Sequence, residues 1–105
     1  MKNIHYLKIF KALADQTRLN IVSMLSHREM CACELLEKLS ISQPTLSHHM
    51  KILIASELVI SRKNATWVYY SINKPAMQKM RELFAQLQET ADQSDDHKND
   101  VCHTK

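Results

Sequence analysis

The 105-residue sequence predicts a mainly α-helical fold with one small β-hairpin. Apolar residues recur at helical spacing along most of the chain, as amphipathic helices require. Residues 58–72 depart from that spacing and are rich in Val, Ile, Thr, Trp and Tyr, which indicates two strands. The chain contains no glycine, which argues against a loop-rich β fold and against phosphate-binding loops that depend on glycine.

Length and composition indicate one domain over residues 1–91 and a flexible polar tail over residues 92–105. A 45% hydrophobic content supports only a small core, so oligomerisation is expected to bury further surface. The net charge is +3, and the tail has four acids and two lysines, so the remaining residues carry +5. A basic body suits a polyanionic partner. We see no signal peptide or membrane span, so a cytoplasmic protein with reduced thiols and no membrane partner is expected.

Two helices are expected at the start of the chain. The first covers residues 3–14, where apolar side chains recur at helical spacing: Ile4, Leu7, Phe10 and Ala14. Asp15 is a suitable N-cap for the second helix, which continues to about Ser26. Its expected apolar face consists of Leu19, Val22, Met24 and Leu25.

A third, short helix is expected over residues 33–39, after a bend at residues 28–33, with Leu35, Leu36 and Leu39 facing inward. Ser42 is a good N-cap for a fourth helix, and Pro44 is tolerated in its first turn. The inward side of that helix is expected to hold Leu46, Met50, Leu53 and Ile54. The opposite side then presents Pro44, His48, Lys51 and Ala55, with Ser47 at the boundary.

The hairpin is expected within residues 58–72, with Arg62, Lys63, Asn64 and Ala65 in its middle. Asn64 can adopt the left-handed turn conformation that glycine would otherwise supply. Pro75 suits the first turn of a last helix, whose apolar residues step by three, four and three: Met77, Met80, Phe84 and Leu87. That spacing is typical of coiled coils, so we favour a dimer seam over a core role.

Two short helices joined by a tight turn and followed by a basic hairpin form a winged helix-turn-helix. The second helix of such a pair enters the major groove of DNA, where its outward polar residues reach base edges and phosphates. The candidate DNA-binding residues on that helix are Ser42, Gln43, Thr45, Ser47, His48 and Lys51. Arg62 and Lys63, at the expected hairpin tip, would contact backbone phosphates. No arrangement of nucleophile and base on rigid elements suggests an enzyme.

Three segments resemble the ArsR/SmtB family of metal-responsive repressors. They are residues 42–53 (SQPTLSHHMKIL), residues 12–19 (ALADQTRL) and residues 67–71 (WVYYS) of the hairpin. The resemblance covers about residues 5–88, although the family usually has glycine at the wing turn. It implies a homodimer joined through the first and last helices. It also implies an imperfectly palindromic operator that is released when an inducer binds.

Cys31-Ala32-Cys33 resembles the Cys-x-Cys pair of family members that sense arsenite or antimonite, but Leu36 stands where a third cysteine often follows. Trivalent arsenic and antimony prefer thiolates, and a helix N-terminus lowers a thiol's pKa. Residues two apart on an α-helix point about 200° apart, so we expect one ion to bind both sulfurs only if the first turn unwinds. That unwinding would distort the support of the recognition helix and weaken DNA binding.

Arsenic prefers three sulfurs, and Cys102 is the only other cysteine. Cys102 could act as third ligand, from its own subunit or across the dimer, or it could be idle, with water or a small thiol in its place. Two further alternatives remain within the same fold. A cadmium, lead or zinc sensor would normally need four ligands, and only His5 is available near the N-terminus. A thiol redox switch would oxidise Cys31 and Cys33. A general nucleoid protein would leave the cysteine pair without a role.

Overall fold

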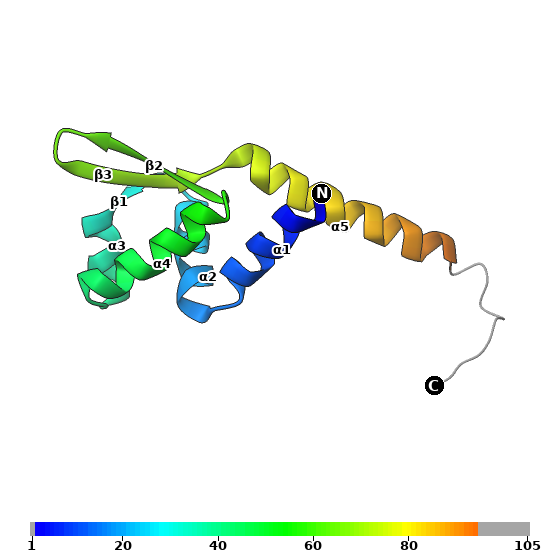
Figure 1. The fold of residues 1–105 in the computed structure, drawn as a ribbon, viewed down its shortest axis with the longest axis horizontal. Coiled ribbons are helices and arrows are strands. Elements are labelled where there is room, and N and C mark those ends of the chain that lie inside the picture. Colours follow the sequence, from blue (N-terminus) through cyan, green and yellow to red (C-terminus); the bar gives the residue numbers. More distant parts are fainter. Residues whose placement is uncertain (1, 95–105) are drawn as a thin grey trace.

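The computed structural model of the protein describes residues 2–94, which form a mainly helical body with a small antiparallel sheet (Figure 1). The helices in this part of the chain are α1 (Lys2–Leu13), α2 (Gln16–Leu25), α3 (Ala32–Leu39), α4 (Gln43–Ala55) and α5 (Lys74–Ser94). The strands are β1 (Met30–Cys31), β2 (Val59–Asn64) and β3 (Trp67–Ile72). This order confirms the predicted winged helix-turn-helix architecture. None of the helices between residues 2 and 94 has the length and apolarity needed to cross a bilayer.

The helix starts are stabilised by side chains near the predicted caps. The Asp15 carboxylate accepts a hydrogen bond from the Arg18 backbone N–H at 3.1 Å, at the start of α2. The Ser42 hydroxyl accepts one from the Thr45 N–H at 3.3 Å, at the start of α4. These bonds satisfy amide groups that the first turn of a helix leaves without partners. Both predicted N-caps are therefore confirmed.

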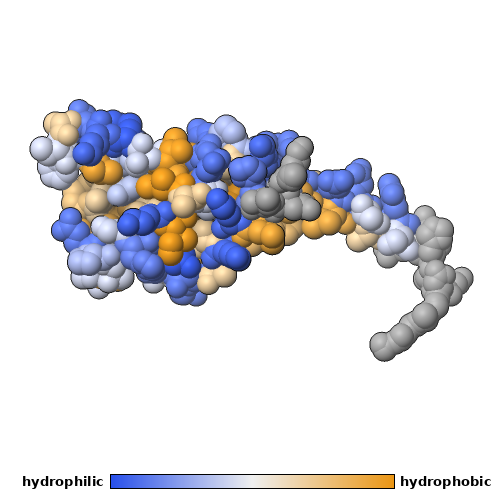
Figure 2. Space-filling model, in the orientation of Figure 1, coloured by the Kyte–Doolittle hydropathy of each residue, from blue (hydrophilic) through white to orange (hydrophobic). Residues whose placement is uncertain are grey.

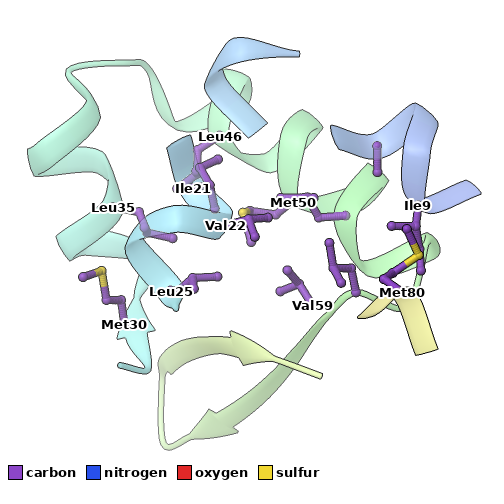
Figure 3. Close-up of a cluster of buried hydrophobic side chains, with 13 residues drawn as sticks. Ile9, Ile21, Val22, Leu25, Met30, Leu35, Leu46, Met50, Val59 and Met80 are labelled. Carbon is purple, nitrogen blue, oxygen red and sulfur yellow. The ribbon is translucent and has the colours of Figure 1, made fainter. Parts of the chain in front are cut away.

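One core connects all the helices and the sheet (Figure 3). Its most enclosed side chains, each with 0% exposure, are Ile21, Leu35, Leu53, Leu58 and Val59. Ile9 of α1 and Met80 of α5 lie together at one end of this cluster. The core therefore fixes α3 and α4 against α2, and it holds the base of the wing to the same body.

The sheet has a third strand that the sequence did not predict. β3 lies in the middle, with β2 on one side and β1 on the other, and both pairings are antiparallel. The segment before α3, expected to form only a bend, pairs Met30 with Tyr70 and Cys31 with Tyr69. A strand of two residues is too short to show an alternation of apolar and polar residues in the sequence. It forms here because the edge of β3 that β2 does not occupy is available for pairing.

The wing turn also differs from expectation. Asn64 is the last residue of β2, and Ala65 takes the left-handed conformation, with φ 59°. The prediction for Asn64 is therefore wrong by one residue. An alanine in this conformation costs about 1 kcal/mol because its Cβ approaches the following carbonyl oxygen. Hydrogen bonding along the hairpin, which pairs Asn64 with Trp67, places the turn at Ala65 and Thr66.

Several apolar side chains of the predicted helical stripes are exposed. Leu7 is 57% exposed, Phe10 39%, Leu19 48% and Ile54 37%, whereas Ile9, Ala12 and Ile21 take the buried positions. On α5, Met80 is buried, but Met77, Phe84 and Leu87 are at least 37% exposed. The Phe10 and Phe84 rings meet edge to face, with their centroids 6.0 Å apart. Apolar surface thus continues from the body onto the projecting part of α5 (Figures 1 and 2).

Candidate nucleic-acid interface and thiol site

The polar residues predicted to contact DNA gather on the exposed side of α4. Ser42, Gln43, Thr45, Ser47, His48 and Lys51 are all exposed. On the other side of this helix, Leu46, Met50 and Leu53 are buried in the core. Residues on one helix face recur every three or four positions, so packing of the apolar face directs the polar face outward. The arrangement has the shape and polarity that fit a major groove.

A tight turn links α3 to α4 and sets the angle at which α4 is presented. Ser40 ends α3 in the left-handed conformation, with φ 56° and ψ 44°. Its backbone N–H still bonds the Leu36 carbonyl at 3.1 Å. Two residues later, Ser42 caps the start of α4, and its hydroxyl also donates to the Thr45 hydroxyl at 2.8 Å. The reversal is therefore determined by local hydrogen bonds at both helix ends.

A polar network that the sequence did not reveal ties α4 to α1 and α2. The Arg18 guanidinium donates to the Ala12 carbonyl at 2.6 Å and lies 3.1 Å from His49 Nδ1. Because arginine can only donate, this nitrogen of His49 is the acceptor in that contact. Asp15 lies 3.9 Å from the same nitrogen. The spacing of Asp15 and Arg18 is visible in the sequence, but their partner lies 31 residues further on.

On the wing, Lys63 is exposed, and Arg62 is already engaged by the protein. The Arg62 Nε and Nη2 atoms each donate to a Glu29 carboxylate oxygen at 2.8 Å. The guanidinium carbon also lies 4.6 Å from the centre of the Tyr69 ring. Both basic residues belong to β2 and precede the turn, so neither lies at the tip itself. A phosphate contact by Arg62 would have to share this cation with Glu29.

The sulfurs of Cys31 and Cys33 converge, contrary to the geometric expectation. They lie 2.6 Å apart without any unwinding of α3. The reason is that Cys31 is the N-cap, in extended backbone with φ −84° and ψ 163°, and belongs to β1. The 100° step per residue holds only between residues inside a helix, and α3 begins at Ala32. The expectation that the two sulfurs point about 200° apart is therefore wrong.

The electrostatics of the pair also differ from expectation. The hydrogen bond between the Cys33 and Cys31 thiols, together with desolvation, raises the pKa of Cys33 above its ordinary value. A lowered pKa had been expected at a helix N-terminus, and that expectation is wrong for Cys33. Cys31 is only 8% exposed, whereas Cys33 is exposed. A ligand would thus approach through Cys33 and reach Cys31 second.

Two acids flank the thiols, and each is paired with an arginine. Glu34 accepts the Cys31 backbone N–H at 3.2 Å and bonds both terminal nitrogens of Arg28, at 2.7 and 3.3 Å. The Arg28 hydrogen bonds, followed by the Cys31 amide, lower the pKa of Glu34 to about 2. Arg62 likewise lowers the pKa of Glu29. Both carboxylates are therefore charged at neutral pH, and each holds one side of the thiol segment.

The remaining predicted ligand, Cys102, lies outside the described residues. Within residues 2–94, no three His, Cys, Asp or Glu side chains come together as a metal site would require. Two soft sulfurs that converge are nevertheless a suitable donor set for a thiophilic ion. Such an ion would need its further ligands from elsewhere.

Known proteins resemble this chain in both sequence and fold. Residues 15–61 match the family described as "Bacterial regulatory protein, arsR family". The chain is 54% identical over 65 residues to the arsenical resistance operon repressor of Staphylococcus xylosus. That alignment covers 62% of this chain and 62% of the repressor, which is less than two thirds of the relative's length. An uncharacterized HTH-type transcriptional regulator of Methanocaldococcus jannaschii is 38% identical over 81 residues, covering 76% of this chain and 91% of the relative.

Among solved structures, HlyU from Vibrio cholerae superposes with a TM-score of 0.69 and 34% sequence identity. The match covers 82% of this chain and 94% of HlyU. The relatives whose names state a role are transcription regulators and not enzymes. The matched segment includes α2, α3 and α4, the elements that build the helix-turn-helix described above. This chain therefore belongs to the arsR family of bacterial regulatory proteins.

Proposed function

We propose that this protein is a transcriptional repressor that binds palindromic operator DNA as a homodimer and releases it when trivalent arsenic or antimony binds Cys31 and Cys33. The observation that carries the proposal is the 2.6 Å approach of the two sulfurs beside the helix-turn-helix. Double-stranded DNA as partner agrees with the exposed polar face of α4, and it implies a cytoplasmic protein. The two staphylococcal relatives are both named arsenical resistance operon repressors.

Binding of arsenite at this pair is a ligand exchange without electron transfer. Each thiol replaces one hydroxyl group of arsenous acid, its proton leaves with that hydroxyl as water, and an As–S bond forms. Two thiols occupy two of the three arsenic positions. The third falls to Cys102 of either subunit in our proposal, with water or a small thiol as the alternative. A cadmium, lead or zinc sensor, with its usual four ligands, agrees less well with two described donors.

Dimerisation through α1 and α5 is part of the same proposal. The exposed apolar residues of those helices are Leu7, Phe10, Met77, Phe84 and Leu87. Exposed apolar patches of this kind commonly mark association surfaces. A two-fold symmetric dimer presents two α4 helices, and a palindromic site provides two matching half-sites.

The test is an arsenite titration of the protein bound to a fluorescent duplex from its own upstream region. We expect arsenite to weaken DNA binding by about 5- to 150-fold, the usual range for coupled sites. The double variant Cys31→Ser/Cys33→Ser should bind DNA as tightly as the wild type does, and arsenite should leave its DNA affinity unchanged. Absorbance of the As–thiolate bonds reports loading independently. Equal DNA affinity of the loaded and free wild-type protein would disprove the proposal.

Two parallel measurements separate the alternatives. Cys102→Ser should raise the arsenite concentration needed for release if Cys102 is the third ligand, and an unchanged value discards that role. Peroxide replaces arsenite in a second titration, because two adjacent thiols could reduce it to two waters and form a disulfide. The close sulfurs favour that redox candidate, but the raised pKa of Cys33 lowers its thiolate fraction. Release by peroxide alone would replace the metalloid proposal.

A further inference from the structure

One of the two thiols lies on the same rung of the sheet as the wing arginine. Cys31 of β1 is paired with Tyr69 of β3, and Tyr69 is paired with Arg62 of β2. Directly opposite residues in antiparallel strands project from the same face, with Cβ atoms about 4.5–5.5 Å apart. The Tyr69 ring therefore stands between the thiol strand and the outer strand of the wing.

A second connection joins the same two strands outside the backbone ladder. Glu29 directly precedes β1, and both of its carboxylate oxygens accept hydrogen bonds from Arg62 at 2.8 Å. Arg62 lies over the Tyr69 ring, so its guanidinium is held on two sides. Paired nitrogens and oxygens of this kind fix orientation as well as distance. We call Glu29, Arg62 and Tyr69 the wing clasp.

A ligand at the thiols has to move this strand or the neighbouring helix turn. An ion that bonds both sulfurs has to reach from the exposed thiol of Cys33 to the buried thiol of Cys31. Cys31 is 8% exposed and packed, and β1 has only two residues, so a displaced Cys31 carries Met30 and Glu29 with it.

We propose that Glu29 is a positioning residue that transmits inducer binding at Cys31 and Cys33 to the wing through Arg62. The inference rests on the proposed function and deepens it by naming the path of regulation. Displacement of β1 pulls the Glu29 carboxylate from Arg62, and the wing then loses the position in which it meets DNA. In this proposal, the effect of inducer binding passes from the thiols to the wing through the sheet. If it passed instead through α3 into α4, Glu29 would have no role in regulation.

The experiment compares Glu29→Gln with Glu37→Gln, a matched control at an exposed glutamate on α3. Arsenite loading is followed by thiolate absorbance, and DNA affinity is measured with and without arsenite. The decisive quantity is the ratio of the two DNA dissociation constants. A glutamate with only a structural role would change both constants and leave their ratio intact. We expect Glu29→Gln to load arsenite normally and to show a ratio at least about fivefold smaller than the wild type.

Trp67 provides a readout without DNA. It is the only tryptophan of the chain, it is half exposed, and it pairs with Asn64 at the outer end of the wing. Arsenite should change its fluorescence in the wild type and in Glu37→Gln, and much less in Glu29→Gln. Tyr69→Phe, which keeps the ring under the guanidinium, should retain the wild-type ratio, whereas Tyr69→Thr should lower it.

Each outcome decides between the proposals. A Glu29→Gln ratio equal to that of the wild type would overturn the wing clasp while leaving the proposed function in place. If arsenite left the DNA dissociation constant of the wild-type protein unchanged, both the proposed function and the wing clasp would be overturned. If Glu29→Gln fails to fold, the Tyr69→Phe and Tyr69→Thr comparison tests the same path, and equal ratios for those two variants would overturn it.

Discussion

Cys33 shows how one neighbouring atom changes the chemistry of a thiol. Its sulfur is exposed, at the start of a helix, yet the hydrogen bond with Cys31 Sγ raises its pKa. A raised pKa favours the protonated form, so the thiolate fraction at a given pH is smaller. The same preference stabilises the fold at low pH, and that contribution is lost as the pH rises through the folded-state pKa. In the proposed function, a thiophilic ion would have to displace the protons of both thiols.

Removing Cys31 should make Cys33 more reactive. We expect Cys31→Ala to increase alkylation of Cys33 by iodoacetamide several-fold at pH 8, because the pKa returns toward its ordinary value. Peptide mass spectrometry over a pH series, in a Cys102→Ser background, measures the rate at Cys33 alone. Cys31→Ser, which keeps a hydrogen-bonding partner, should fall between the two. Identical pH profiles for the wild type and Cys31→Ala would mean that Cys31 does not control this thiol.

At the scale of elements, α4 combines a packed face, a capped start and a polar anchor. Met50 and Leu53 are 2% and 0% exposed, so the helix cannot rotate without opening the core. The contact of Arg18 with His49 joins its middle to α2. Ser42 caps the helix, and it also lies among the residues proposed to contact DNA.

Two substitutions of Ser42 separate these uses. Ser42→Ala should lower the free energy of unfolding by about 1 kcal/mol, measured by urea denaturation, because the Thr45 amide loses its partner. Ser42→Asp keeps a capping oxygen and should keep near wild-type stability. It also places a negative charge where we propose that DNA phosphates lie, so it should weaken operator binding by at least about tenfold. Wild-type DNA affinity in Ser42→Asp would remove Ser42 from the interface.

At the scale of the whole molecule, much apolar surface lies outside the core. Phe84 and Leu87 are each 55% exposed on α5, and Leu7 is 57% exposed on α1. Within residues 2–94 this surface concentrates on the two terminal helices, which Phe10 and Phe84 bring into contact. A chain of this size gains substantially from burying such surface between two copies.

A charge within this surface should therefore separate the subunits. We expect Phe84→Asp to raise the dimer dissociation constant by at least about 100-fold, because two buried carboxylates would lose their hydration without partners. Light scattering coupled to gel filtration measures the mass. Ile60→Asp is the matched control, since Ile60 is 48% exposed but lies on β2. A dimeric Phe84→Asp protein, or a monomeric wild type, would contradict the assignment of this surface.

The sequence and approximate bounds of the helices and the hairpin were predictable from the residues alone. Caps at Asp15 and Ser42, the change of period at the hairpin and the stripes of the helices all depend on neighbours within a few positions. The core side of α4 was predicted from the same periodicity, except for Ile54. Local propensity and periodicity are properties of short segments, so a single sequence carries them.

Tertiary contacts decided the rest. The pairing of β1 with β3, the Glu29–Arg62 ion pair and the Arg18–His49 contact join residues about 30 or more positions apart. The convergence of Cys31 and Cys33 followed from β1 as well, because only the strand takes Cys31 out of helical geometry. Which apolar residues face the core and which remain exposed was likewise settled by packing. Such contacts depend on where separate segments meet in space, and no periodicity within one segment encodes that meeting.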